Sequence, residues 1–112
     1  MDGLELVAFQ IISAVGTARS CFIEAIQKAK NGYFSEAYDL IREGENYYVQ
    51  GHHAHGDLIK KEANGEHVSI NLLLLHAEDQ LMSAESFKVL AEEFIDVHHK
   101  LFVLTNEQQN VS

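Results

Sequence analysis

The side chains most able to do chemistry lie in the stretch HAEDQ (residues 76–80), directly after four leucines at 72–75. On a helix, His76 shares one face with Asp79 and Gln80, three and four residues further on. An imidazole and a carboxylate beside so apolar a stretch cost free energy unless both are partnered. Imidazole can carry a phosphoryl group as a phosphoramidate, and Asp79 can bind a cation, alone or together with its copies in a symmetric oligomer. The alternative is a core histidine hydrogen-bonded to Asp79, which periodicity alone favours.

A second group of histidines, His52, His53 and His55, suggests a metal site. Only His52 and His55 share a helical face, and no cysteine or nearby carboxylates complete a ligand set. Adventitious binding of nickel or zinc therefore fits this group better than a dedicated site, although a metal-binding helical bundle stays open as a hypothesis. The single cysteine, Cys21, excludes an internal disulfide and indicates a reducing compartment.

Three helical segments must position these residues. Apolar residues recur every three or four positions from Leu4 to Ala29, and Asn31-Gly32 then marks a left-handed stop. Gly16 in this segment is expected to mark close helix approach, and Arg19 to pair with a carboxylate or a phosphate. Ser35 is expected to cap the second segment, which ends at Asn64-Gly65. The third segment is expected over about 69–104, followed by a polar, frayed tail at 105–112.

Two short breaks between long helices predict an all-α, antiparallel, up-down three-helix bundle, one domain over residues 1–104. The leucines at 72–75 cover every side of the third helix, and two neighbouring helices cannot bury them all. Other copies of the chain in a closed ring are the economical cover.

Charge and hydropathy limit the partners and the location. The net charge of −9 argues against nucleic acid and anionic membranes. The N-terminus lacks the basic start of a signal peptide, and the leucine run is far shorter than a membrane span. We therefore expect a soluble, cytoplasmic protein.

Three motifs resemble those of the lactose/cellobiose-specific IIA components of the bacterial phosphoenolpyruvate-dependent sugar phosphotransferase system. The stretch LLLLHAEDQLM (72–82) is similar to that family's active-site helix, with its pattern close to His-Ala-Gln-Asp-His-Leu-Met. GTARS (16–20) is similar to the family's Gly-Asp-Ala-Arg-Ser, and HHAHGDLIKKEANGE (52–66) to its Ala-His-x-x-His-x-x-Leu-Ile-x-x-Glu-Ala-x-Gly-Glu. The likeness runs in order from about Leu4 to Leu104, nearly the whole chain.

The resemblance implies a homotrimeric phosphotransferase component. His76 would accept a phosphoryl group from the histidine phosphocarrier HPr and pass it to a cysteine of a IIB component. This transfer would serve the uptake of lactose, cellobiose or chitobiose type sugars, which a separate membrane component, IIC, binds. Asp79 would gather with its copies around a divalent metal, Mg²⁺, on the trimer axis. Gln80 would support the site by hydrogen bonding, and His52 and His55 are secondary candidates near a neighbouring subunit's His76.

The sequence departs from the family pattern at two positions. Gln80 stands where the family often has a second histidine, and it keeps a donor and an acceptor but cannot titrate. Glu78 stands where the family often has glutamine, and it is expected to point to solvent. If it points inward, its charge would slow phosphorylation of His76. A non-catalytic regulatory or interaction module on the same trimeric bundle is therefore the alternative function.

Overall fold

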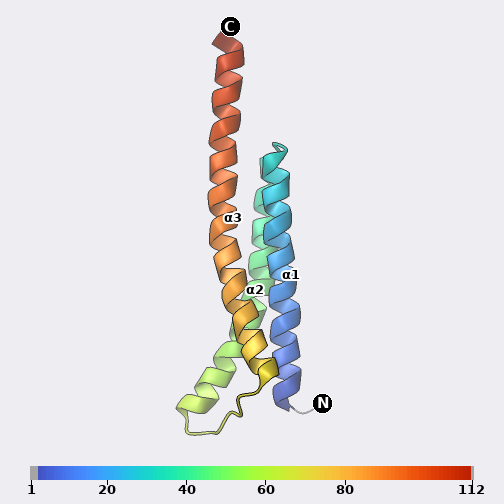
Figure 1. Cartoon of the computed structure of the whole chain (residues 1–112), viewed down its shortest axis with the longest axis vertical. Helices are drawn as coiled ribbons and strands as arrows, with labels where there is room; N and C mark the ends of the chain where they lie inside the picture. The colour runs from blue at the N-terminus through green and yellow to red at the C-terminus, as the bar shows by residue number, and fades with distance from the viewer. Residues whose placement is uncertain (1–2, 112) are drawn as a thin grey trace.

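The computed structural model describes residues 3–111, with side-chain surroundings as far as residue 107. It contains three helices, α1 (Gly3–Lys30), α2 (Phe34–Ala63) and α3 (Leu72–Val111), and no strand within the described residues. The helices run up, down and up, and α3 extends well past the turn between α1 and α2 (Figure 1). The molecule is consequently a rod of 68 × 24 × 20 Å. This arrangement confirms the predicted all-helical, up-down bundle.

The predicted stops between the helices are confirmed. Gly32 and Gly65 adopt φ angles of +84° and +85°, a conformation that glycine adopts without strain. The predicted cap at Ser35 is wrong, because α2 begins at Phe34 and the capping position falls on Tyr33, whose side chain makes no capping bond. The backbone provides the turn instead, since the Tyr33 N–H donates to the Lys28 carbonyl and the Tyr33 carbonyl accepts from Ala37.

The third helix begins at Leu72, later than expected. Its N-terminus is capped by Asn71, whose side-chain oxygen accepts a hydrogen bond of 2.8 Å from the Leu74 N–H. The segment expected as a polar tail, 105–112, is helical as far as Val111, and Ser112 lies outside the described residues. Asn71 and the buried Leu74 together fix where α3 starts and which of its faces turns to the core.

The core consists of two clusters along the rod. The lower cluster joins Ile11 and Val15 of α1 to Leu58 of α2 and to Leu74 and Leu81 of α3. The upper cluster centres on Phe22, with Ile41 and Ile95 from the other two helices. Alanines fill most remaining core positions, so the helices approach closely.

Two glycines of α2 allow this approach. A Cβ at Gly44 would lie 2.5 Å from the Phe22 ring, and one at Gly51 would lie 2.5 Å from Cγ1 of Val15. Gly16 has open space beside it, so the prediction that it marks a close helix contact is wrong. Gly16 lies on α1 where neither neighbouring helix packs against it.

The first helix is, by length and composition, apolar enough to cross a membrane, with a mean hydropathy of 1.6 over 18 residues. Core helices of soluble proteins share that composition. In this fold the buried residues of α1, among them Ala8, Ile11, Val15, Ala18 and Phe22, supply the α1 side of both core clusters. The packing of the bundle accounts for part of the apolar character of α1, since 33% of that 18-residue window is buried.

Candidate functional site

His76 lies in the second turn of α3 and its side chain is exposed. Asp79 is also exposed and Gln80 is half-buried, on the same side of the helix as the sequence predicted. No polar or charged side chain is buried among the described residues. The core-histidine alternative is therefore wrong, because the imidazole of His76 is open to solvent.

The neighbours of His76 on α3 explain this exposure. Ala77 is fully buried and Leu81 nearly so, and each residue along a helix is rotated by about 100° from the one before. Fixing Ala77 and Leu81 in the core consequently turns both His76 and Asp79 away from the core. The candidate site thus lies on a helix rather than on a loop.

Glu78 faces α2. Its Oε1 lies 2.9 Å from Nε2 of His55, and the His55 and Glu78 side chains are 22% and 42% exposed. Glu78 is thus partly open to solvent, as the sequence predicted, but its carboxylate also contacts α2, which the sequence did not predict. Glu78 and His76 are two residues apart and point to opposite sides of α3. Within one chain, His55 therefore lies on the other side of α3 from His76.

This contact belongs to a row of polar bridges between α2 and α3. Glu45 forms an ion pair of 3.1 Å with Lys88. The next bridge joins Tyr48 to Glu85, and burial together with the Glu85 charge and hydrogen bond raises the pKa of the Tyr48 hydroxyl. His55 and Glu78 complete the row. From one bridge to the next, the residue number rises along α2 by as much as it falls along α3, because the two helices are antiparallel. Sequence patterns missed this row because it depends on the register of two helices.

His52 does not join the His55 contact. It is exposed, and its ring centroid lies 6.0 Å from that of Tyr48. No three His, Cys, Asp or Glu side chains come together as metal ligands in the described part of the chain. A metal centre built on His52 and His55 within one chain is therefore not supported.

Arg19 does not make the predicted bond to a carboxylate. Its guanidinium lies over the Phe87 ring, 4.9 Å from the centroid, and its Nε is buried without a partner among the described residues. Cys21 is buried, and burial followed by the charges of Glu43 and Glu24 raises the pKa of its thiol. Less thiolate at neutral pH makes Cys21 a poor nucleophile.

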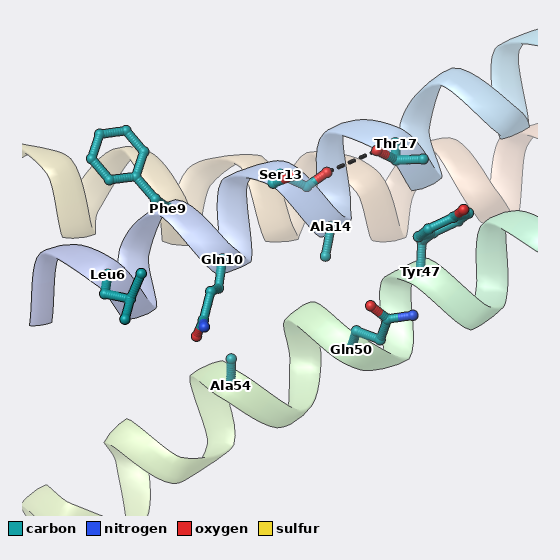
Figure 2. Close-up of a pocket in the computed structure, with 9 residues that line it drawn as sticks. All are labelled: Leu6, Phe9, Gln10, Ser13, Ala14, Thr17, Tyr47, Gln50 and Ala54. Carbon is teal, nitrogen blue, oxygen red and sulfur yellow. Dashed lines mark hydrogen bonds between the residues drawn. The ribbon is translucent and has the colours of Figure 1, made fainter. Parts of the chain in front are cut away.

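A groove of about 510 Å³ lies between α1 and α2, away from the histidine site. Figure 2 shows Gln10 and Gln50 extending into it from facing helices, and Thr17 donating a hydrogen bond of 2.9 Å to the Ser13 carbonyl. Apolar and uncharged polar side chains line it, and it contains no titratable group other than Tyr47. The groove therefore offers no catalytic group to His76.

An apolar stripe runs the length of α3 on its outer face. Leu72 is 82% exposed, Leu75 51% and Met82 67%, although each is a large hydrophobic side chain. Asp79 falls at the same three- and four-residue spacing, between Leu75 and Met82. We call this surface the apolar stripe, and its members are Leu72, Leu75, Met82, Val89, Leu90, Phe94, Val97, Leu101 and Leu104.

Comparison with known proteins identifies the family. The sequence model of the lactose/cellobiose-specific IIA subunit of the phosphotransferase system matches residues 6–99. The chain belongs to this IIA family. It is thus a component of a sugar phosphotransferase system, and the resemblance carried by its three motifs is confirmed.

Relatives and solved structures agree with this assignment. The oligo-beta-mannoside-specific EIIA component of Bacillus subtilis is 42% identical over 93 residues, 83% of this chain and 84% of that protein. The crystal structure of a cellobiose-specific enzyme IIA from Bacillus anthracis superposes with a TM-score of 0.90 at 42% identity, covering 92% of this chain and 94% of that one. The IIA(chitobiose) structure, solved in complex with HPr, superposes with a TM-score of 0.80 at 29% identity, over 90% and 98% of the two chains.

Proposed function

We propose that this IIA component carries a phosphoryl group on His76, taking it from HPr and passing it to a cysteine of a IIB component. The exposure of His76 on a rigid helix is the observation that carries the proposal. A further support is the similarity to the IIA(chitobiose) protein, whose structure was solved in complex with HPr. Because His76 is exposed, a protein partner can reach it without any opening of the bundle.

The chemistry of the first transfer needs little from the protein beyond positioning. A ring nitrogen of His76 attacks phosphorus in line as the nitrogen–phosphorus bond of the donor phosphohistidine breaks. The second ring nitrogen of His76 then loses a proton, and the leaving imidazole of the donor gains one. In the next transfer a cysteine thiolate of IIB attacks the same phosphorus, the bond between phosphorus and the His76 nitrogen breaks, and the leaving imidazole of His76 regains a proton.

Gln80 supports the carried group. It lies one turn after His76 on the same side of α3 and is half-buried. Its amide N–H groups can donate hydrogen bonds to the phosphoryl oxygens. Because an amide does not titrate, Gln80 holds the group without moving a proton.

We further propose that three copies assemble on the apolar stripe of α3. A row of large exposed hydrophobic side chains over nearly the whole of a 40-residue helix exceeds what monomeric proteins usually leave in water. Residues Leu90, Phe94, Val97, Leu101 and Leu104 follow alternating steps of four and three, the spacing of a coiled-coil seam. Parallel packing of α3 with its copies would cover this seam.

Asp79 fits a shared metal in that assembly. Its carboxylate is exposed within the apolar stripe, where association would bring the three copies together in an apolar surrounding. Like charges that converge in such a place repel unless a cation neutralises them, and carboxylate oxygens suit a hard ion such as Mg²⁺. The ion would supply charge neutralisation and leave the phosphoryl chemistry to His76.

The sugar class is proposed from the relatives and not from a sugar site on this chain. The relatives named above act in oligo-beta-mannoside, cellobiose and chitobiose systems. We propose uptake of a lactose, cellobiose or chitobiose type sugar through a membrane IIC component, with this chain working in the cytoplasm beside HPr and IIB.

The decisive experiment is phosphorylation by phosphoenolpyruvate, enzyme I and HPr. The chain should gain an acid-labile, alkali-stable phosphate, which is characteristic of a phosphoramidate, and His76→Ala should abolish it. Failure of the wild-type chain to gain phosphate would contradict the proposal.

The departures at Glu78 and Gln80 favour one alternative, a regulatory or interaction module that keeps the bundle without carrying phosphate. That alternative expects normal trimers, no phosphate on His76, and a protein partner recovered by pulldown. The same phosphorylation assay therefore separates the two functions.

A further inference from the structure

A cavity of about 560 Å³ lies at the end of the bundle where α1 begins and where the last turns of α2 diverge from the other helices (Figure 1). The start of α1, the end of α2 and the segment that joins α2 to α3 enclose it. Its volume falls within the range of about 300–1,000 Å³ that is usual for small-ligand sites. None of its lining residues belongs to the apolar stripe, so the proposed assembly does not rely on them.

The inner wall of the cavity is apolar. Leu58 is only 9% exposed and belongs to the lower core cluster. The half-buried side chains of Leu4, Val7 and Val68 pack against that cluster and line the cavity beside Leu58. A hydrocarbon group that enters this space leaves water for an apolar surface, which lowers its free energy. The cavity therefore suits a ligand with an apolar body.

The rim of the cavity provides hydrogen-bond donors and a positive charge. The side chains of Lys61 and His67 lie on the rim and form no ion pair or hydrogen bond within the described residues. An imidazole donates an N–H in either of its protonation states. The side-chain oxygen of Asn71 already accepts from the Leu74 N–H, so its two amide hydrogens remain as donors. The Ser69 hydroxyl adds a further donor.

The charges around the cavity favour an anion. Among the residues that the structure describes, no aspartate or glutamate lines it, although the chain contains 17 acidic residues. Glu62 and Glu66 are close to Lys61 in sequence, but neither lines the cavity. The helix ends give no clear preference, since α1 begins here with its positive end and α2 ends here with its negative end. The Lys61 ammonium group therefore decides the sign of the ligand.

We propose that this cavity binds a small organic acid with an apolar body. The apolar body lies against Leu58 and Val7, and the carboxylate accepts hydrogen bonds from Lys61 and Asn71. A free acid fits better than an anionic bilayer, because the net charge of −9 repels such a surface. The proposal does not depend on phosphoryl transfer, since the cavity shares no lining residue with the site at His76.

The test titrates the isotope-labelled full chain with octanoate and follows the backbone amide signals by NMR. Octanoate should shift the signals of Leu4, Val7 and residues 67–71 in a saturable manner. Octanol keeps the apolar body and acetate keeps the carboxylate. Each should bind at least about fivefold more weakly than octanoate, because each lacks one of the two interactions.

Two lysine variants test the role of charge. Lys61→Gln should weaken octanoate binding about three- to tenfold, because it removes the ammonium group and keeps a long side chain. Lys60→Gln is the matched control, since Lys60 is the adjacent lysine in the last turn of α2 and does not line the cavity. It should bind octanoate as the wild type does. Both lysines are exposed, so neither substitution is expected to disturb folding.

Four results would overturn the proposal. The first is the absence of a saturable shift with octanoate, and the second is equal binding of octanol and octanoate. The third is equal weakening by Lys60→Gln and Lys61→Gln, which would indicate a general effect of charge. The fourth is a set of shifts centred on the apolar stripe of α3 instead of the cavity. Phosphorylation is not measured in this experiment, so its failure is distinct from a failure of the proposed function.

Discussion

At the scale of single residues, His76 and Asp79 carry most of the proposed function. Both are exposed, yet both lie beside large hydrophobic side chains of α3. His76 has the accessibility that a phosphoryl acceptor needs, whereas Asp79 lies within the surface that we expect other copies to cover. One turn of helix thus contains two polar groups for which we propose separate roles.

Substitution of Asp79 tests whether this residue binds a metal ion together with its copies. Wild-type chain should melt at a higher temperature as Mg²⁺ is added, because an ion that binds only the assembled state stabilises it in proportion to the logarithm of its concentration. Asp79→Asn should lose this response while still assembling, since three neutral amides do not repel. Thermal melts with EDTA and with millimolar Mg²⁺ measure both. Loss of the response in His52→Ala or His55→Ala instead would point to a metal site on α2.

The reactivity of Cys21 follows from its surroundings. The raised thiol pKa means less thiolate at pH 8 than a free cysteine has, and burial against Phe22 and Gly44 limits access. Iodoacetamide should therefore modify the folded chain much more slowly than the urea-unfolded chain. Equal rates before and after unfolding would contradict the burial of Cys21.

At the scale of elements, the fit of α2 against α1 depends on which of its glycines face a neighbour. Gly44 lies against Phe22 and Gly51 against Val15, whereas Gly56 has nothing within 4 Å. Alanine has a higher helix propensity than glycine, so the same substitution has opposite effects at contacting and free positions.

Gly44→Ala should lower the free energy of unfolding by about 1–3 kcal/mol, because the new methyl group overlaps the Phe22 ring. Gly56→Ala should raise the free energy of unfolding by up to about 1 kcal/mol. Urea unfolding at equal chain concentration gives both values. A stabilising Gly44→Ala would mean that α1 and α2 are further apart than described.

The elements could largely be predicted from the sequence, because glycine stops and apolar spacing are local signals. Gly32 and Gly65 end the first two helices as expected, and the three- and four-residue spacing placed His76 and Asp79 on one side of α3. Which glycine allows close approach could not be read reliably, because it depends on how each helix is rotated. The contact between His55 and Glu78 escaped prediction for a related reason, since the residues are 23 positions apart and meet only through helix register.

At the scale of the whole molecule, the three helices leave much of the apolar surface of α3 uncovered. The exposed side chains extend from Leu72 to Leu104, beyond the turn at Gly32 where α1 ends. Phe102 packs beside that turn, 5.6 Å from Phe34 between ring centroids, and the helix then continues alone. Self-association is the simplest way to bury such a surface.

The proposed assembly contains three copies of the chain. Sedimentation equilibrium should give three times the 12.6 kDa mass of the chain at micromolar concentration. The paired substitutions Val97→Glu and Leu101→Glu should shift the mass toward one chain, because they place charges in the apolar stripe. Val49→Glu adds a charge at an equally exposed apolar residue of α2 and should leave the mass unchanged. A wild-type monomer would contradict assembly on this surface.

The identity of the phosphoryl acceptor is the central claim, and intact-mass measurement after incubation with phosphoenolpyruvate, enzyme I and HPr tests it most directly. The wild-type chain should gain one phosphate and His76→Ala none. His53→Ala, which removes an exposed histidine of α2, should gain one phosphate as the wild type does. A phosphate on His76→Ala, or none on the wild type, would contradict the account.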